Sequence, residues 1–478
     1  MLFNSINFGI FLFIIFLLYW ILNNKGIRLQ NCLLLVASYF FYACWDWRFL
    51  FLLIFSTLLD YFTGIMMEKS ITESMKGFWF WLSVIINVGF LAVFKYFNFF
   101  SISFSNAFSN LGVKINPWTL KVILPVGISF YTFHGLSYVI DIYKGRIKAE
   151  KNFIDYTLFV SFFPLLVAGP IERATHLLPQ IKKERKFEYL KMVDGLRQIL
   201  WGLFKKIVIA DSCAESVNSI FNNSSHYNGS THVVGAILFA FQIYCDFSGY
   251  SDIAIGTARL LGIELLRNFA FPYFSRDIAE FWRRWHISLS SWFKDYLYIP
   301  LGGSRVGTFK KIRNTFIIFL VSGFWHGANW TFIVWGCLHA LYIMPSIIFK
   351  TNRRNIETIA MGKMLPNLKE LSSMLLTFTL TVIAWVFFRS ENLHAAFEFL
   401  KCIFSSSLFK YPTILPVKIL FVLAILILIE WLGRENKYAL EKFAMTWTKS
   451  LRWSFYIFLI LIIFLNQGKQ AAFIYFQF

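Results

Sequence analysis

The chain has 478 residues, of which 57% are apolar, 20% aromatic and only 15% charged. A soluble core does not absorb 58 Phe, 21 Tyr and 17 Trp at a mean hydropathy of +0.58, whereas a bilayer dissolves such side chains. This composition excludes a cytosolic enzyme, a disordered chain and a secreted disulfide scaffold. No polar stretch is long enough to bury a core of its own, so we expect one all-α, integral-membrane domain over residues 1–478.

The formal net charge of +20 indicates the side of the membrane on which loops lie. In a membrane protein an excess of Lys and Arg marks cytoplasmic loops near anionic lipid, so lipid is an expected partner and nucleic acid is not. The six cysteines are far apart and form no CxxC pair. We therefore expect them to be packing residues, with no metal site and no bound cofactor.

The first half of the chain predicts several membrane crossings. An apolar run over residues 8–22 has no cleavage site after it and is expected to stay as an anchor. Lys25 and Arg28 follow it, which places the N-terminus outside. Further apolar segments cover 31–67, 78–100 and 122–142, the first of them broken near Trp45-Asp46-Trp47 into two helices.

Basic stretches frame the next segments. Residues 153–169 are apolar but contain helix breakers and lie between basic stretches, so we expect a segment that dips into the membrane and returns. Residues 173–206 and 276–313 are rich in Lys and Arg and are expected on the cytoplasmic side. Between Lys206 and Arg259 there is no Lys or Arg, so the polar loop 218–231 is expected on the outer side of the membrane.

The second half combines a predicted surface helix with further crossings. Aromatic residues recur at three- and four-residue steps over 276–298, which predicts one amphipathic helix ending at 300–303. Residues 314–349 contain no charged side chain; one helix of that length would reach roughly 54 Å against a hydrocarbon core of about 30 Å, so two arms broken at Gly323, Gly327 or Gly336 are expected. Spans at 371–388, 420–429 and 453–466 complete about 11 to 13 crossings.

His326 is the strongest candidate for chemistry. An ionisable side chain at membrane depth usually faces a cavity or a partner. His326 lies very roughly 18 Å from the start of the uncharged segment 314–349 if the first arm of that segment is helical. Flanking small residues would let a substrate approach the backbone, and a neutral imidazole suits proton transfer from a hydroxyl. A packed histidine bonded to a carbonyl explains the same local pattern equally well.

Two weaker candidates accompany it. His286 lies on the predicted aromatic helix, where a solvated interfacial histidine is the simpler explanation. Asp246, Ser248 and Asp252 interrupt an apolar run and must be hydrogen-bonded internally, so with Asn329 they are candidates for the lining of a polar tunnel. The spacing of the two aspartates does not place them on one helical face, which disfavours a paired-carboxylate mechanism.

Several motifs in order make the chain similar to a known family, the membrane-bound O-acyltransferases, and within it to the alginate O-acetyltransferase-like branch that O-acetylates polysaccharides. The resemblance covers nearly the whole length. The motifs are MLFNS at 1–5, LPVGISFYTFHGLSYVIDIYKG at 124–145, FFPLLVAGPIER at 162–173, YCDFSGYSDIAIG at 244–256, FWRRWHISLSSWFKDYLYIPLGG at 281–303, FWHGANW at 324–330 and FIYFQF at 473–478.

The resemblance implies a function and its residues. It implies that His326 is the catalytic histidine and His286 the second active-site histidine, within a ring of transmembrane helices that is thin at its centre. It implies acetyl-CoA as the cytoplasmic donor substrate, whose phosphates would meet the basic face at candidate contacts. These candidates are Arg283, Arg284, Lys294 and Arg305.

The same resemblance implies a setting in the cell. A protein of this branch is a multi-pass protein of the bacterial cytoplasmic (inner) membrane, and it hands acetyl groups to a separate extracytoplasmic acetyltransferase or acceptor protein. The final acceptor is then an exopolysaccharide or cell-wall glycan. Two alternatives stay open: D-alanyl transfer toward teichoic acid from a carrier-protein thioester, and a non-enzymatic transporter or flippase that uses the buried aspartates for conduction.

Overall fold

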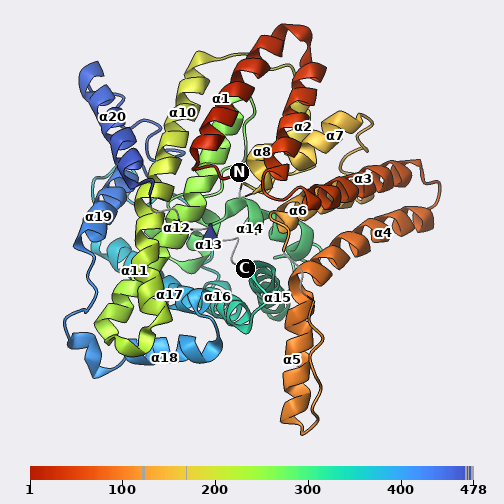
Figure 1. The fold of residues 1–478 in the computed structure, drawn as a ribbon. Coiled ribbons are helices and arrows are strands. Elements are labelled where there is room, and N and C mark those ends of the chain that lie inside the picture. The colour runs from red at the N-terminus through yellow and green to blue at the C-terminus, as the bar shows by residue number, and fades with distance from the viewer. Residues whose placement is uncertain (121–123, 168, 469–470, 472, 475–478) are drawn as a thin grey trace. The chain divides into compact units, whose positions relative to one another are not determined.

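The described chain is all-α, and Figure 1 shows its helices. The computed structural model describes residues 1–120, 124–167, 169–468, 471 and 473–474, and no β-strand occurs among them. These residues form two compact units, Met1–Met192 with Thr257–Leu266, and Val193–Gly256 with Arg267–Phe478. That residues 1–478 act as one integral-membrane domain stays a prediction.

The helices of the first unit begin and end at local sequence signals. The Ser5 hydroxyl accepts a hydrogen bond from the backbone N–H of Phe8 and caps the first helix. Gly26, at φ 99°, makes the sharp turn into the second. The helices are α1 (Ile6–Ile21), η1 (Leu22–Lys25), α2 (Ile27–Ala43), α3 (Arg48–Lys69), α4 (Glu73–Leu91), η2 (Ala92–Tyr96), α5 (Phe97–Asn110) and α6 (Ile128–Tyr143).

The predicted break inside residues 31–67 is confirmed. α2 ends at Ala43 and α3 begins at Arg48, so the Trp45-Asp46-Trp47 segment lies in the turn. The Asp46 carboxylate accepts from the backbone N–H of Arg48 at 3.0 Å and pairs with its guanidinium at 2.6 Å. A short acidic side chain at the start of a helix is favourable because the first backbone N–H groups have no partner within the helix.

The segment 153–169 is not a single crossing, in agreement with its helix breakers. α7 (Phe153–Ser161) has nine residues, about 14 Å at 1.5 Å per residue, which is short of a hydrocarbon core of about 30 Å. α8 (Phe163–Leu166) is one turn with Pro164 at its start. Residue 168 lies outside the described residues, and α9 (Ala174–Ile181) follows.

Glycine allows a close backbone contact within the second unit. A Cβ at Gly202 would collide with the carbonyl oxygen of Gly249, and a Cβ at Gly249 with the carbonyl oxygen of Gly202. The backbones of α10 and α12 therefore touch, which brings the residues after Gly202 against the middle of α12. The helices here are α10 (Tyr189–Leu203), η3 (Phe204–Ala210), α11 (Asp211–Asn222), η4 (Ser224–His226) and α12 (Gly229–Leu260).

The prediction of one surface helix over 276–298 is wrong. The chain breaks at Trp285-His286, where His286 takes the left-handed conformation with φ 43°. Phe281 and Trp285 are each only 1% exposed, so the aromatic face is buried in protein instead of lying on a bilayer. Tertiary packing has overridden the helical period. The pieces are η5 (Pro272–Phe274), α13 (Ile278–Arg284), α14 (Ile287–Phe293) and η6 (Lys294–Tyr298).

The uncharged segment 314–349 forms two helices, as predicted. α15 (Thr308–His326) and α16 (Trp330–Ile348) are joined at Gly327, one of the three expected break points. A Cβ at Gly323 would meet the carbonyl of Phe332, and one at Gly336 the carbonyl of Phe319. These glycines therefore let the two helices pack backbone to backbone.

Among the described residues, seven helical segments are long and apolar enough to cross a membrane, fewer than the predicted 11 to 13 crossings. Other apolar helices are shorter, for example α2 with 17 residues. The segments are Ile6–Lys25, Arg48–Lys69, Glu73–Ser109, Gly229–Leu260, Trp330–Ile348, Leu368–Arg389 and Lys449–Asn466. The last helices of the chain are α17 (Leu368–Arg389), α18 (Leu393–Ile403), η7 (Ser406–Phe409), α19 (Val417–Leu432) and α20 (Lys449–Asn466).

Candidate active site

His286 occupies the break between α13 and α14, and its imidazole is fully buried. Its Nδ1 lies 2.9 Å from Oδ1 of Asn268. The ring packs edge-on against Phe247, with 4.6 Å between centroids, and parallel to Phe269 at 6.4 Å. Burial lowers the pKa of His286 to about 3, so the imidazole is neutral at physiological pH.

His326 is the last residue of α15 and is 3% exposed. Three aromatic rings contact its imidazole: Trp325 at 4.9 Å, Trp335 at 5.1 Å and Phe388 at 5.4 Å between centroids. They come from α15, α16 and α17. The candidate base predicted from the sequence therefore lies among aromatic rings at a helix end.

A single indole ring brings the two predicted histidines into one site. The Trp325 centroid is 4.9 Å from that of His326 and 6.1 Å from that of His286. The two histidines are 40 positions apart in the sequence, and only the fold places them around the same side chain. The full burial of the His286 ring also weakens the explanation of His286 as a solvated interfacial residue.

The glycines beside His326 do not have the role that the sequence predicted for them. The space that a Cβ at Gly327 would take is filled by the ring of Phe332, and the space at Gly323 by the carbonyl of Phe332. The missing side chains thus serve the tight packing of α15 on α16 and do not open the backbone to a substrate. The approach to His326 is lined by aromatic rings instead.

A third histidine, His339, joins this aromatic layer. It is fully buried on α16, and its Nδ1 accepts a hydrogen bond from the indole Nε1 of Trp282 at 3.2 Å. Its ring lies 5.0 Å from that of Trp335, which in turn contacts His326. The hydrogen bond to Trp282 is typical of a structural or supporting position for His339.

A cavity of about 750 Å³ lies on the other side of Trp282. Among the described lining residues five are cationic and none is acidic. The opposite walls carry apolar groups, among them Ile318, Phe319 and Ile347, and Ile287 links the lining to the neighbouring His286. The cationic residues are Arg283, Lys294, Lys311, Lys350 and Arg353. This combination suits a ligand with both phosphates and an apolar arm.

Two of the four donor contacts predicted from the sequence line this cavity, Arg283 and Lys294. Arg283 is held in place by the carbonyl oxygens of Asn352 and Asn355. Arg284 lies outside the lining, because its guanidinium is paired with Glu280 at 2.8 Å. Arg305 is exposed and also lies outside it. The charges of Lys311, Lys350 and Arg353 were not singled out from the sequence.

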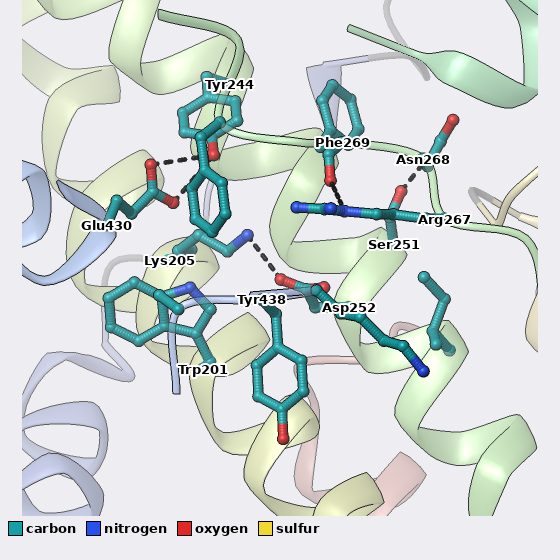
Figure 2. A pocket seen from close by; sticks show the side chains of 14 residues that line it. Trp201, Lys205, Tyr244, Ser251, Asp252, Arg267, Asn268, Phe269, Glu430 and Tyr438 are labelled. Atoms are coloured by element: carbon teal, nitrogen blue, oxygen red, sulfur yellow. Dashed lines mark hydrogen bonds and ion pairs between the residues drawn. The ribbon is translucent and has the colours of Figure 1, made fainter. Parts of the chain in front are cut away.

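A separate, small cavity of about 20 Å³ is bordered by buried ion pairs (Figure 2). Lys205 Nζ lies 2.6 Å from Asp252 Oδ2 and donates to the Ser248 hydroxyl at 2.9 Å. The Tyr244 hydroxyl donates to the Glu430 carboxylate at 2.8 Å. These buried polar side chains are bound to one another, as burial in an apolar interior requires.

The neighbouring lysine forms a second buried cluster. Lys206 Nζ lies 2.6 Å from Asp211 and 2.7 Å from Asp246, and all three side chains are at most 2% exposed. Asp246 Oδ2 accepts from the backbone N–H of Ile474 at 2.8 Å, so the cluster binds the described start of the C-terminal FIYFQF motif. Residues 475–478 of that motif lie outside the described residues.

These contacts revise the interpretation of two sequence features. Lys205 and Lys206 belong to the basic stretch 173–206, whose charges were expected to mark the cytoplasmic side, but both side chains are buried and paired with α12. The two aspartates bind different lysines, which agrees with the prediction that they do not act as a carboxylate pair. Asn329 caps α16 by accepting from the backbone N–H of Thr331, so its amide is engaged in the helix start.

Several known proteins are similar to this chain. A family model for the membrane-bound O-acyltransferase family matches residues 146–388. A probable alginate O-acetylase of Pseudomonas aeruginosa is 40% identical over 409 residues, covering 85% of this chain and 75% of that protein. A peptidoglycan O-acetyltransferase of Helicobacter pylori is 38% identical over 414 residues, covering 81% of this chain and 76% of that protein. A teichoic acid D-alanyltransferase of Streptococcus thermophilus is 31% identical over 269 residues, covering 51% of this chain and 63% of that protein.

The helices and the family match together define a multi-pass membrane enzyme that transfers acyl groups to oxygen. The chain belongs to the membrane-bound O-acyltransferase family. This family membership removes the transporter alternative, since the members are acyltransferases.

We predict that Lys206→Met destabilises the protein by about 3–5 kcal/mol, because it leaves the Asp211 and Asp246 carboxylates buried without their cation. Thermal unfolding of the detergent-purified protein measures this. Lys401→Met is the matched control, since Lys401 and its partner Glu398 are exposed and such pairs contribute less than about 1 kcal/mol. Equal unfolding temperatures for the two variants would contradict the prediction.

Proposed function

We propose that this protein transfers an acetyl group from cytoplasmic acetyl-CoA to an extracytoplasmic acceptor, for O-acetylation of an exopolysaccharide or cell-wall glycan. The proposal rests on one observation, that the two buried histidines and a cationic cavity are neighbours. The buried histidine pair around Trp325 lies next to a cavity whose described charged residues are all cationic, with Ile287 and Trp282 between them.

The reaction follows from the chemistry of the histidine pair. Neutral His326 takes the proton of the acceptor hydroxyl while that oxygen attacks the thioester carbonyl carbon. The new C–O bond forms, the C–S bond breaks, and the CoA thiolate leaves with the proton that His326 returns. The aromatic rings around His326 exclude water, so the acetyl group passes to the acceptor instead of being hydrolysed. His286 orients or stabilises the reacting group.

The large cavity supports CoA as the carrier of the acetyl group. CoA bears phosphates at one end and an extended pantetheine arm at the other, and the cavity offers five cations together with apolar walls. Its volume of about 750 Å³ is within the range of ligand sites for molecules of this size. The thioester end would lie toward Trp282 and Ile287, on the side of the histidines.

The acceptor side of the proposal rests on the relatives. The names of two of them specify alginate and peptidoglycan, which supports a glycan as the final acceptor, reached through a separate extracytoplasmic acetyltransferase or acceptor protein. D-alanyl transfer has less support, because the D-alanyltransferase relative aligns with only 51% of this chain. Purified protein that transfers D-alanine from a carrier thioester, and no acetyl group from acetyl-CoA, would favour that alternative.

The proposal requires a defined orientation in the bacterial inner membrane, with the N-terminus outside and the basic stretches in the cytoplasm. We predict that a cysteine at Ser225 reacts with a membrane-impermeant thiol reagent in intact cells, whereas one at Lys183 does not. Both positions are exposed, and the six native cysteines are free thiols that must first be replaced. Labelling of Lys183→Cys to the same extent as Ser225→Cys would refute the orientation.

We predict that Lys294→Gln and Lys311→Gln each raise the KM for acetyl-CoA about tenfold with little change in kcat, because each removes a charge that binds ground state and transition state alike. Steady-state kinetics with varied acetyl-CoA measures both constants. Arg305→Gln is the control, since Arg305 is cationic and exposed but lies outside the cavity lining. An unchanged KM in both lysine variants would exclude this cavity as the donor site.

We predict that His326→Ala lowers acetyl transfer by about 10²–10⁴-fold, the usual contribution of a general base, and that His286→Ala costs less. Transfer is measured with purified protein and the acceptor partner. His394→Ala, at an exposed position on α18, controls for the loss of any histidine. A His326→Ala protein with parental unfolding temperature and near-parental activity would disprove the assignment.

A further inference from the structure

Asn268, which no sequence motif singled out, is fully buried and bound at both ends of its amide. Its Oδ1 accepts from the hydroxyl of Ser288 at 2.9 Å and, more weakly, from the backbone N–H of Ser288 at 3.4 Å. Its Nδ2 donates to the Ser251 hydroxyl on α12 at 3.1 Å. Its backbone carbonyl accepts from the N–H of Ile287 at 2.9 Å.

These contacts determine which way the amide points. A backbone N–H is only a donor, so the amide atom that faces the N–H of Ser288 must be the oxygen. The same oxygen lies 2.9 Å from Nδ1 of His286. Nδ1 of the neutral imidazole therefore carries the proton and donates it to Asn268, which leaves the lone pair on Nε2.

The remaining nitrogen is available to a substrate. Nε2 of His286 is buried and has no hydrogen-bond partner among the described residues. With the proton on Nδ1, this nitrogen accepts hydrogen bonds and cannot donate one. A neutral His286 of this tautomer orients an O–H or N–H group of a substrate, and it does not stabilise an oxyanion.

Asn268 also secures the backbone on which His286 sits. The left-handed conformation of His286 is uncommon for a residue with a side chain and persists only when neighbouring contacts hold it. Asn268 contacts three consecutive residues of this turn: the side chain of His286, the backbone of Ile287 and both the backbone and the hydroxyl of Ser288. Asn268 thus holds in place both the turn and the buried imidazole of His286.

We propose that Asn268 is the positioning residue of the acyltransferase site, which holds His286 in its Nδ1–H tautomer and presents the Nε2 lone pair to a substrate hydrogen. This inference rests on the proposed function for its catalytic consequence, but the tautomer itself is measurable without any substrate. Asn268 acts through His286 and contacts neither donor nor acceptor, so its replacement affects kcat and leaves the KM for acetyl-CoA near the parental value.

Three variants of the full-length protein test the catalytic consequence. Asn268→Leu keeps the approximate volume but removes the acceptor, and we expect kcat to fall about 10²-fold, within the range for loss of acid–base assistance. Asn268→Asp keeps an acceptor, and we expect it to retain kcat within about tenfold. Asn31→Leu, which removes another buried asparagine with several hydrogen bonds, controls for structural damage and should leave kcat unchanged.

The pH profile separates positioning from a structural role. The described residues in contact with the His286 ring are Asn268, Phe247, Phe269 and Trp325, and none of them titrates. A carboxylate introduced by Asn268→Asp therefore favours the imidazolium, and the acidic limb of kcat/KM should move to higher pH. A merely structural role for Asn268 would lower activity without moving this limb.

Nitrogen NMR of purified protein labelled with ¹⁵N-histidine tests the tautomer directly, with the His286 signals assigned from His286→Gln. We expect a protonated Nδ1 and an unprotonated Nε2 in the parent, and loss of this pattern in Asn268→Leu. A protonated Nε2 in the parent, or an unchanged tautomer and kcat in Asn268→Leu, would overturn the proposal. If the parent shows the expected tautomer but transfers no acetyl group from acetyl-CoA, the proposed function fails while the control of His286 by Asn268 stands.

Discussion

The structure of the active site depends on the rule that charges in an apolar interior must be paired. Lys205 and Lys206, directly after the glycine contact of α10 with α12, bind Asp252 and Asp246 on α12. These pairs hold α12, which also carries Ser251, and the Ser251 hydroxyl accepts a hydrogen bond from the amide of Asn268. The orientation of His286 is therefore the last step of a chain that begins with buried ion pairs.

The site divides into a charged part and a dry part, with an aromatic layer between them. The cavity holds five cations, whereas the described ring neighbours of His326 are aromatic. Trp282 borders the cavity and donates to His339, which packs against Trp335. In the proposed reaction, such a layer would separate the phosphates of the donor from the reacting carbonyl and keep water away from the thioester. Electrostatic interactions are stronger in a medium of low dielectric constant.

Family membership and geometry explain different parts of the function. The match to membrane-bound O-acyltransferases accounts for acyl transfer to oxygen, a chemistry that the named relatives perform on different polymers. The contacts of Trp325 with both histidines place them around one buried side chain, which is the arrangement on which the proposed transfer rests. The proposal of acetyl-CoA as donor rests on the cavity, which is lined by cations from α13, η6, α15 and the residues after α16.

The sequence by itself determined the all-α membrane class, the helix break near Asp46 and the paired helices on either side of Gly327, and it singled out His326 and His286 as candidates. These features depend on local apolar runs, helix breakers and contiguous motifs, which a linear sequence displays. Only the tertiary structure decided that the aromatic stretch breaks at His286, that Lys205 and Lys206 are buried, and that Asn268 holds an imidazole 18 positions away. Such contacts join residues far apart in the chain, and their energy comes from burial and pairing that no local pattern encodes.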